Sequence, residues 1–244
     1  MIKANNPAAR LHIVFSQIRK KPDKTSLKDA LIEIFNLQPN STPQLFHIII
    51  KLTELLQNAK NAIEKLDIPN KELYLKPFPN FETLLSMTNL NVGISSTRSL
   101  LNDVNMNTLE FCSAKLSEGI TEKPISEKKI SDIQKEIEKL IEGVLEATSI
   151  SNDLQRIILQ KLRAIHFTIL NYRIFGSEAI KEELESIIGS YIVNNPLYKS
   201  NEKSEELNSF WKLVAKISNL LSTVTNLKRL SEPYIPALME AIKN

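Results

Sequence analysis

The amino-acid sequence predicts an all-α protein, a multi-helix bundle of about eight to ten helices with a long helical hairpin in its C-terminal half. Three observations support this class. Apolar residues recur three and four positions apart along most of the 244 residues, which is the period of an amphipathic helix. Glycine is scarce, with 5 residues, and several of the 11 prolines fall between the periodic segments. The hydrophobic fraction of 42% and the charged fraction of 24% are ordinary for a globular protein.

The N-terminal half, residues 1–122, is predicted to be a helical subdomain with irregular connections. Its expected helices cover residues 7–18, 27–35, 43–66 and 80–85, with one or two more within 87–119. Residues that start or cap helices precede several of them, namely Asn6 with Pro7, Ser26 with Asp29, Pro43 and Asn80. Three prolines exclude a regular helix from 67–80, where the alternation of residues 72–76 predicts a short extended segment.

The C-terminal half, residues 123–244, is predicted to be a helical bundle that follows a polar linker around Pro124 and packs with the first half as one unit. A heptad pattern opens it, carried by Ile130, Ile133, Ile137, Leu140, Val144 and Ala147. Ser151 caps the next helix after a short break, so the two helices are expected to form an antiparallel hairpin. The heptads favour an intramolecular seam, with self-association as the alternative.

Three further helices are expected beyond this hairpin. Gly176 is predicted to take a left-handed conformation and Ser177 to cap a helix that reaches Tyr191. A helix over 204–230 carries Trp211, expected in the core, and a short last helix begins at Pro233.

Composition also limits the chemistry. With so few glycines, the sequence lacks the glycine-rich loops that bind dinucleotides or triphosphates and the loop that presents a hydrolase serine. The histidines His12, His47 and His166 have no second histidine at ligand spacing, and Cys112 is a lone cysteine in a helical pattern, expected as a buried hydrophobe. We therefore predict no catalytic, cofactor-binding or metal-binding residues, and no cofactor.

The first candidate binding site is the basic run formed by Arg19, Lys20, Lys21 and Lys24 at the end of the first helix. Such a run can bind a phosphate backbone or an acidic partner. The simpler interpretation is a solvated helix end, where cations favour the negative end of the helix dipole. Asp23 lies within the run and the formal net charge is only +3, so the simpler interpretation is preferred.

The second candidate site lies in the segment from Lys161 to Arg173. It contains Arg163, His166, Tyr172 and Arg173 among many apolar residues. A helix that is apolar on more than one face either lies centrally in a bundle, with its arginines paired to glutamates of neighbouring helices, or binds a partner. The glutamates Glu178, Glu182, Glu183 and Glu185, by contrast, are spaced as a solvated helix face and not as catalytic carboxylates.

Two stretches carry a resemblance. The opening Asn6–His12 and the hairpin region from Ile130 to Ile192, especially Leu162–Ile165 and Tyr172–Gly176, resemble uncharacterised all-helical bacterial proteins of accessory or anti-phage defence type. The resemblance covers about a third of the chain and rests on helix-forming patterns. It implies a bacterial accessory setting and no particular catalytic or binding residue.

These observations lead to one functional prediction and two alternatives. The prediction is a non-enzymatic interaction or regulatory protein, such as a bacterial defence or toxin–antitoxin component, that binds a protein partner or itself. The first alternative is a nucleic-acid-binding accessory protein that uses the Arg19–Lys24 helix end. The second is an unrecognised enzyme built from dispersed residues such as His166 and a glutamate. Charged residues interrupt the longest apolar segments, so no membrane partner and a cytoplasmic location are expected.

Overall fold

The protein was analysed as a computed structural model that describes residues 6–38, 41–86, 90–118 and 125–222. Within these ranges the regular structure is helical, apart from one isolated antiparallel bridge between Ser26 and Gly93. The predicted all-α class is therefore confirmed. The predicted linker residue Pro124 and the predicted last helix from Pro233 lie outside the described residues, as does the end of the helix expected to reach Leu230.

Contacts within the chain divide it into two compact units. Unit 1 consists of Met1–Thr121 together with Arg173–Phe175, and unit 2 of Glu122–Tyr172 together with Gly176–Asn244. A three-residue segment from the second half of the sequence thus belongs to unit 1.

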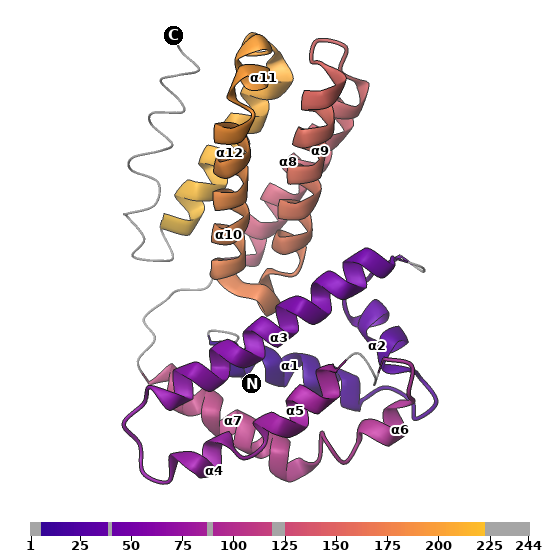
Figure 1. Ribbon diagram of the computed structural model, residues 1–244, viewed down its shortest axis with the longest axis vertical. Helices are drawn as coiled ribbons and strands as arrows, with labels where there is room; N and C mark the ends of the chain where they lie inside the picture. Colours follow the sequence, from indigo (N-terminus) through magenta and orange to yellow (C-terminus); the bar gives the residue numbers. More distant parts are fainter. Residues whose placement is uncertain (1–5, 39–40, 87–89, 119–124, 223–244) are drawn as a thin grey trace. The chain divides into compact units, whose positions relative to one another are not determined.

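Unit 1 is arranged around its first helix. Its helices are α1 (Pro7–Arg19), α2 (Leu27–Ile34), α3 (Thr42–Glu64), α4 (Lys71–Leu75), α5 (Phe78–Leu85), α6 (Ile94–Thr97) and α7 (Asp103–Ser117) (Figure 1). Helix α1 packs against α2, α3 and α7. Its apolar face, with Leu11, Phe15 and Ile18, is fully buried, as the spacing of these residues predicts.

Asn6 fixes the start of α1 and also ties it to α7. Its side-chain oxygen accepts a hydrogen bond from the Ala9 backbone N–H at 2.9 Å, which caps the helix. Its side-chain nitrogen donates to the Ser113 carbonyl at 3.0 Å and to Ser117 Oγ at 2.8 Å. Both the oxygen and the nitrogen of this buried side-chain amide therefore have hydrogen-bond partners.

The predicted extended segment at residues 72–76 is wrong, because Lys71–Leu75 forms the short helix α4. Asn70 takes a left-handed conformation (φ 52°) immediately before this helix. Asn tolerates that conformation better than most residues, so the chain turns there and begins a single helical turn between the prolines.

Segment Arg173–Phe175 completes the core of unit 1. The Phe175 ring stacks on Phe35 with 5.9 Å between ring centroids, and Arg10 Nη1 donates to the Phe175 carbonyl at 3.5 Å. Gly176 follows with φ 77° and ψ −173°, a backbone conformation that is essentially restricted to glycine. The predicted left-handed exit from the preceding helix is therefore wrong: Gly176 has a positive φ but an extended ψ, and the preceding helix already ends at Leu170 with Asn171 as its C-cap.

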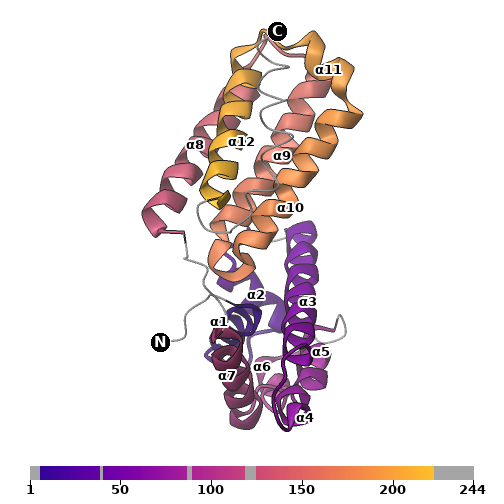
Figure 2. The ribbon, with the colours of Figure 1, turned by 90° about the vertical axis from the view of Figure 1, so that its left-hand side faces the viewer.

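Unit 2 is built from four long helices that run side by side in both ribbon views (Figures 1 and 2). Its helices are α8 (Glu127–Glu146), α9 (Asn152–Leu170), α10 (Tyr172–Val193), α11 (Asn195–Ser200) and α12 (Glu205–Ser222). Helix α8 packs against α9 and α12, so the predicted hairpin is confirmed. Gln155 Nε2 of α9 donates to the Val144 carbonyl near the end of α8 at 2.7 Å.

The core of unit 2 contains the heptad residues of α8. Ile133, Ile137 and Val144 are buried, and the other members of the pattern pack at the core's edge. The heptads thus form an intramolecular seam. Aromatic rings fill the far end of the core, where Tyr191, Tyr198 and Trp211 lie 5.3 to 5.7 Å apart; the predicted core position of Trp211 is confirmed.

Among the described residues, helices that combine the length and the apolar character needed to cross a membrane are absent.

Candidate functional site

Two of the four cations in the basic run at the end of α1 are held in ion pairs. Arg19 Nη2 lies 2.7 Å from Asp103 Oδ1 of α7. Lys21 pairs with Glu33 of α2. These carboxylates neutralise charge that a phosphate backbone would otherwise contact.

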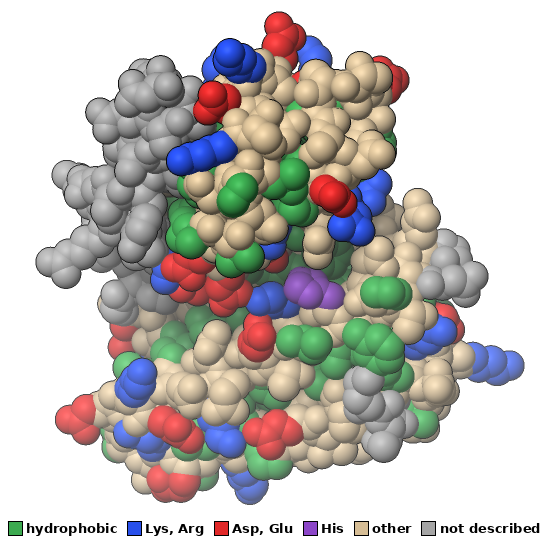
Figure 3. Space-filling view, turned by 45° about the horizontal axis from the view of Figure 1, so that its top comes forward, with side chains coloured by type: hydrophobic (Ala, Val, Ile, Leu, Met, Phe, Trp, Pro, Cys, Tyr) green, Lys and Arg blue, Asp and Glu red, His purple; other side chains and the backbone are tan. Residues whose placement is uncertain are grey.

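The other charged residues of this run carry charges of both signs. Asp23 Oδ1 accepts a hydrogen bond from Arg98 Nε at 2.7 Å. Lys20 and Lys24 are exposed and, within the described ranges, have no ion-pair partner. On the face shown in Figure 3, Lys and Arg side chains are interspersed with Asp and Glu. The structure therefore favours a solvated helix end.

The second predicted group is not brought together at one place. Arg163 and His166 lie on α9 in unit 2, Tyr172 follows that helix, and Arg173 belongs to unit 1. Tyr172 Oη accepts a hydrogen bond from the Ile125 backbone N–H at 3.1 Å. This bond holds the residues that directly precede α8. Tyr172 therefore has a structural role, and Arg173 is exposed elsewhere.

His166 is half-buried beside α8. Its Nε2 lies 3.2 Å from Glu138 Oε1, but the geometry is not that of a hydrogen bond, and this buried nitrogen has no hydrogen-bond partner within the described part of the chain. The contact joins α8 to α9, while the carboxylate is mainly exposed.

Arg163 contradicts the expectation that the arginines of α9 pair with glutamates of neighbouring helices. Its side chain is exposed and, among the residues that the structure describes, has no ion-pair partner. Its backbone position explains this, because Leu162 and Ile165 on either side turn inward to the core of unit 2 and leave Arg163 on the outer face.

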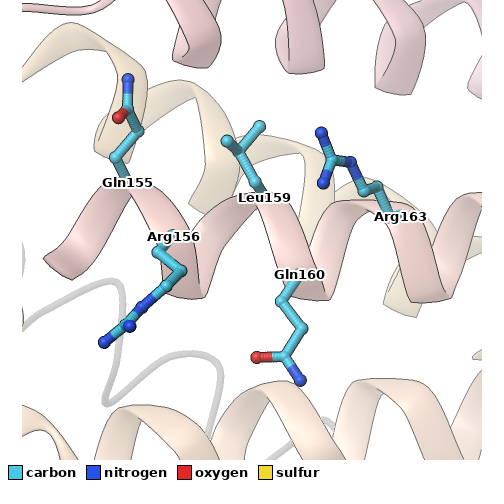
Figure 4. Close-up of a pocket in the computed structure, with 5 residues that line it drawn as sticks. All are labelled: Gln155, Arg156, Leu159, Gln160 and Arg163. Carbon is cyan, nitrogen blue, oxygen red and sulfur yellow. The ribbon is translucent and has the colours of Figure 1, made fainter. Parts of the chain in front are cut away.

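An open groove of about 460 Å³ lies on the same outer face. It is lined by Gln155, Arg156, Leu159, Gln160 and Arg163. In Figure 4, Gln155, Leu159 and Arg163 project from one side of α9, and Arg156 and Gln160 from the other. Leu159 is nearly buried and forms the apolar floor, with arginine and glutamine side chains around it. We call this surface the α9 face.

Sequence reasoning found Arg163 but missed the other members of the α9 face. Their spacing of four residues (155, 159, 163 and 156, 160) was a visible signal for two neighbouring rows on a helix. What the sequence did not indicate was that these rows face outward, since apolar residues occupy several sides of this helix.

His12 on α1 is a further titratable residue that sequence reasoning did not single out. Burial lowers its pKa below the ordinary 6.5, with smaller opposing and reinforcing effects from Glu110 and Arg19. Ser16 Oγ lies 3.4 Å from His12 Nδ1 one helical turn later. This weak local contact suits a packed, neutral imidazole.

Neither a metal site nor an activated thiol emerges from the described residues. They contain no group of three or more His, Cys, Asp or Glu side chains able to hold a metal ion. Cys112 is fully buried, and burial raises the pKa of its thiol to about 12. A thiol with this pKa is almost entirely protonated near neutral pH and is a poor nucleophile, which agrees with its predicted role as a buried hydrophobe.

Comparison with protein-family models, with curated proteins and with solved structures finds no match to this chain.

Proposed function

We propose that this chain is a non-enzymatic helical interaction protein that binds a protein partner through the α9 face. In this proposal it acts in the cytoplasm of a bacterium, as an accessory component of anti-phage defence or of a toxin–antitoxin pair. The observation that carries the binding proposal is the groove on α9, where a leucine floor is bordered by two exposed arginines and two amides.

The chemistry of the groove is that of a protein interface. Arginine is enriched at interfaces because its flat guanidinium combines apolar contact with several hydrogen-bond donors. Arg163 has neither a salt bridge nor a buried environment to account for it among the described residues. Binding energy at interfaces concentrates in a few such residues around an apolar centre, and Leu159 supplies that centre.

The two alternatives have less support. Nucleic-acid binding by the Arg19–Lys24 helix end would use a run in which Arg19 and Lys21 are already ion-paired. An enzyme that uses His166 would have to work with a ring fixed between helices and a mainly exposed Glu138 beside it.

Affinity capture with a charge-reversed variant tests the proposal. The tagged full chain, Arg163→Glu and the control Lys128→Glu are used as baits in the native host, and captured proteins are identified by mass spectrometry. Lys128 is an exposed cation on the first turn of α8, away from the α9 face. We expect a partner that wild type and Lys128→Glu both retain and that Arg163→Glu loses by at least about tenfold.

The same eluates decide between the classes of partner. Equal recovery of every protein by all three baits would contradict the proposal. Nucleic acid in the wild-type eluate, seen as a raised 260/280 nm absorbance ratio and lost when Lys20→Glu/Lys24→Glu serves as a fourth bait, would favour the first alternative.

A further inference from the structure

We propose that the partner of the α9 face is an acidic amphipathic helix of another protein, which lies along α9 and places carboxylates against Arg156 and Arg163. This inference rests on the proposed function, because it names the chemistry of the partner at the same site. It is carried by the spacing of exposed residues on α9, by the uncompensated charge of that helix and by the acidic character of the helices beside it.

Arg156, Arg163 and Leu170 form one exposed line along α9. They follow each other at intervals of seven residues, and two turns of an α-helix take about 7.2 residues, so their Cα atoms lie on one side of the helix. All three are exposed, and Leu170 is 49% exposed at the end of the helix. Repeats of seven residues are the pattern by which one helix contacts another along its length. The line therefore fits a helix that runs along α9 for about 21 Å.

The residues around this line combine an apolar floor with two diverging arginines. In Figure 4, Arg163 projects from α9 on the same side as Leu159, and Arg156 projects on the opposite side. Leu159 is 8% exposed and lies between the two arginines in the sequence of the helix. A helix that lies in this groove has an arginine on each flank. Apolar contact at Leu159 and Leu170 supplies the attraction, and the arginines select carboxylates through charge-assisted hydrogen bonds.

Helix α9 has an excess of basic residues. It contains Arg156, Lys161 and Arg163 against Asp153 alone, whereas α8 and α10 each contain more acidic than basic residues and α12 is balanced. Arg156 Nη2 lies 3.3 Å from Asp153 Oδ1, but both side chains are highly exposed. Such an exposed pair is weak and is readily exchanged for a better one.

The acidic residues of the neighbouring helix α8 do not compensate Arg163. Within the described part of the chain, Arg163 has no ion-pair partner. Glu136 of α8 pairs instead with Lys216 of α12, and Glu138 lies 3.2 Å from His166 Nε2. An acidic partner therefore supplies the compensating charge that Arg163 lacks in the protomer.

The acidic excess of α8 and α10 favours a protein helix over a nucleic acid. Neighbouring helices in a bundle lie about 8 to 10 Å apart, and a helix with its side chains is about 10 to 12 Å across. A single helix can therefore contact α9 without covering the exposed faces of α8 and α10. A nucleic-acid duplex is wider, so its phosphates would also lie over these two acidic helices and be repelled.

The proposal specifies a sequence pattern for the partner. Carboxylates lie opposite Arg156 and Arg163, and apolar residues lie opposite Leu159 and Leu170. The partner helix thus carries acidic, apolar, acidic and apolar residues at intervals of three, four and seven residues, in one chain direction or the other.

Synthetic helical peptides test this pattern on the full-length chain. The acidic probe is a fluorescently labelled, alanine-based peptide with Glu, Leu, Glu and Leu at these intervals, prepared in both sequence directions. Two matched probes carry Gln or Lys in place of both Glu residues. Fluorescence anisotropy at low salt is expected to show that wild type binds the acidic probe, in one of its directions, at least about tenfold more tightly than the Gln probe. Added salt is expected to weaken this binding.

Charge-reversed variants on opposite sides of α9 locate the site. Arg163→Glu is expected to weaken binding of the acidic probe by at least about tenfold and to bind the Lys probe more tightly than wild type does. Lys161→Glu changes the charge of the same helix by the same amount. Lys161 reaches Ser186 of α10, away from the α9 face, so this variant is expected to bind as wild type does. Circular dichroism confirms that both variants keep their helices, and the gained binding of the Lys probe excludes misfolding of Arg163→Glu.

Crosslinking in the native host tests the chemistry of the natural partner. Photoreactive benzoylphenylalanine replaces Gln160 of the α9 face, and the crosslinked segment is sequenced by mass spectrometry. We expect a segment of another protein that has more Asp and Glu than Lys and Arg and that contains the pattern described above.

Several results would overturn the inference. They are equal binding of the acidic and Gln probes, an acidic probe that binds Arg163→Glu as tightly as wild type, and a crosslink to nucleic acid, to a second copy of this chain or to no partner. Capture that Arg163→Glu loses, together with a crosslink to a protein segment without an acidic excess, would overturn the inference and leave the proposed function standing. Capture that Arg163→Glu does not alter, together with no preference for the acidic probe, would remove both proposals.

Discussion

His12 and Cys112 show how burial sets the chemistry of single residues in unit 1. Each side chain has a titratable group, and burial disfavours the charged form of that group because it removes the surrounding water. The same cause moves their pKa values in opposite directions, because the charged form of histidine is protonated and that of cysteine is deprotonated. Burial thus lowers the pKa of His12 and raises that of Cys112 to about 12. Both side chains stay neutral near pH 7 and act as packing groups of α1 and α7.

The lowered pKa of His12 predicts a loss of stability in acid. In the unfolded chain the imidazole takes up its proton near pH 6.5, whereas in the folded chain it does so only at lower pH. Between these two pKa values the unfolded state binds more protons, so the free energy of unfolding falls as the pH falls below about 6.5. Urea unfolding of wild type and His12→Gln at about pH 7.5 and about pH 5.5 measures this effect.

We expect His12→Gln to lose less stability between the two pH values than wild type does. Both proteins carry the same carboxylates, so the difference between their pH dependences comes from the imidazole and its electrostatic interactions with Glu110 and Arg19. An identical pH dependence in wild type and variant would contradict the assignment of His12 as a half-buried base with a lowered pKa.

At the scale of helices, the sequence predicts elements well where local signals and burial agree. Asn6, Ser26 and Ser151 cap the helices that they precede, and the heptads of α8 line the core. Helix α4 was missed because five residues do not complete an apolar period. The outward orientation of Arg163 was missed because a helix with several apolar sides does not reveal which side its neighbours cover. Exposure of a site is a tertiary property, so the α9 face became recognisable only in the folded bundle.

A pair of truncations on α8 tests the inward and outward sides of this helix. Ile137 is fully buried in the core of unit 2, whereas Leu145 is half exposed at the end of the same helix. We expect Ile137→Ala to lower the free energy of unfolding by about 2 to 5 kcal/mol, since a buried cavity is left behind. Leu145→Ala should cost less than about 1 kcal/mol, because little packing is lost. Chemical denaturation of both variants measures the difference, and equal losses would contradict the described orientation of α8.

At the scale of the whole molecule, sequence order and spatial organisation differ. Unit 1 ends at Thr121 in its main part, but the later segment Arg173–Phe175 also lies with unit 1. No periodicity in the sequence shows that Arg173–Phe175 belongs to unit 1. A phenylalanine in a helical pattern is expected to pack in the core formed by the helices next to it in the sequence. Only Gly176, with its glycine-restricted backbone, marks where the chain leaves the segment again.

Phe175→Ala tests this assignment. Loss of the ring that stacks on Phe35 should destabilise unit 1 by about 3 kcal/mol or more. Hydrogen exchange followed by mass spectrometry is expected to show faster exchange in α1 and α2, with α8 and α12 little changed. Faster exchange confined to α8–α12 would show that Phe175 supports unit 2 instead.

The position of Arg173–Phe175 has a consequence for synthesis on the ribosome. Domains commonly fold in the order in which they emerge. Here the ring that completes unit 1 is made only after both α8 and α9, whose contacts with each other join neighbouring segments of unit 2. The hairpin that begins the second half is therefore able to form while the earlier half of the chain still lacks part of its core, so assembly is completed out of the order of translation.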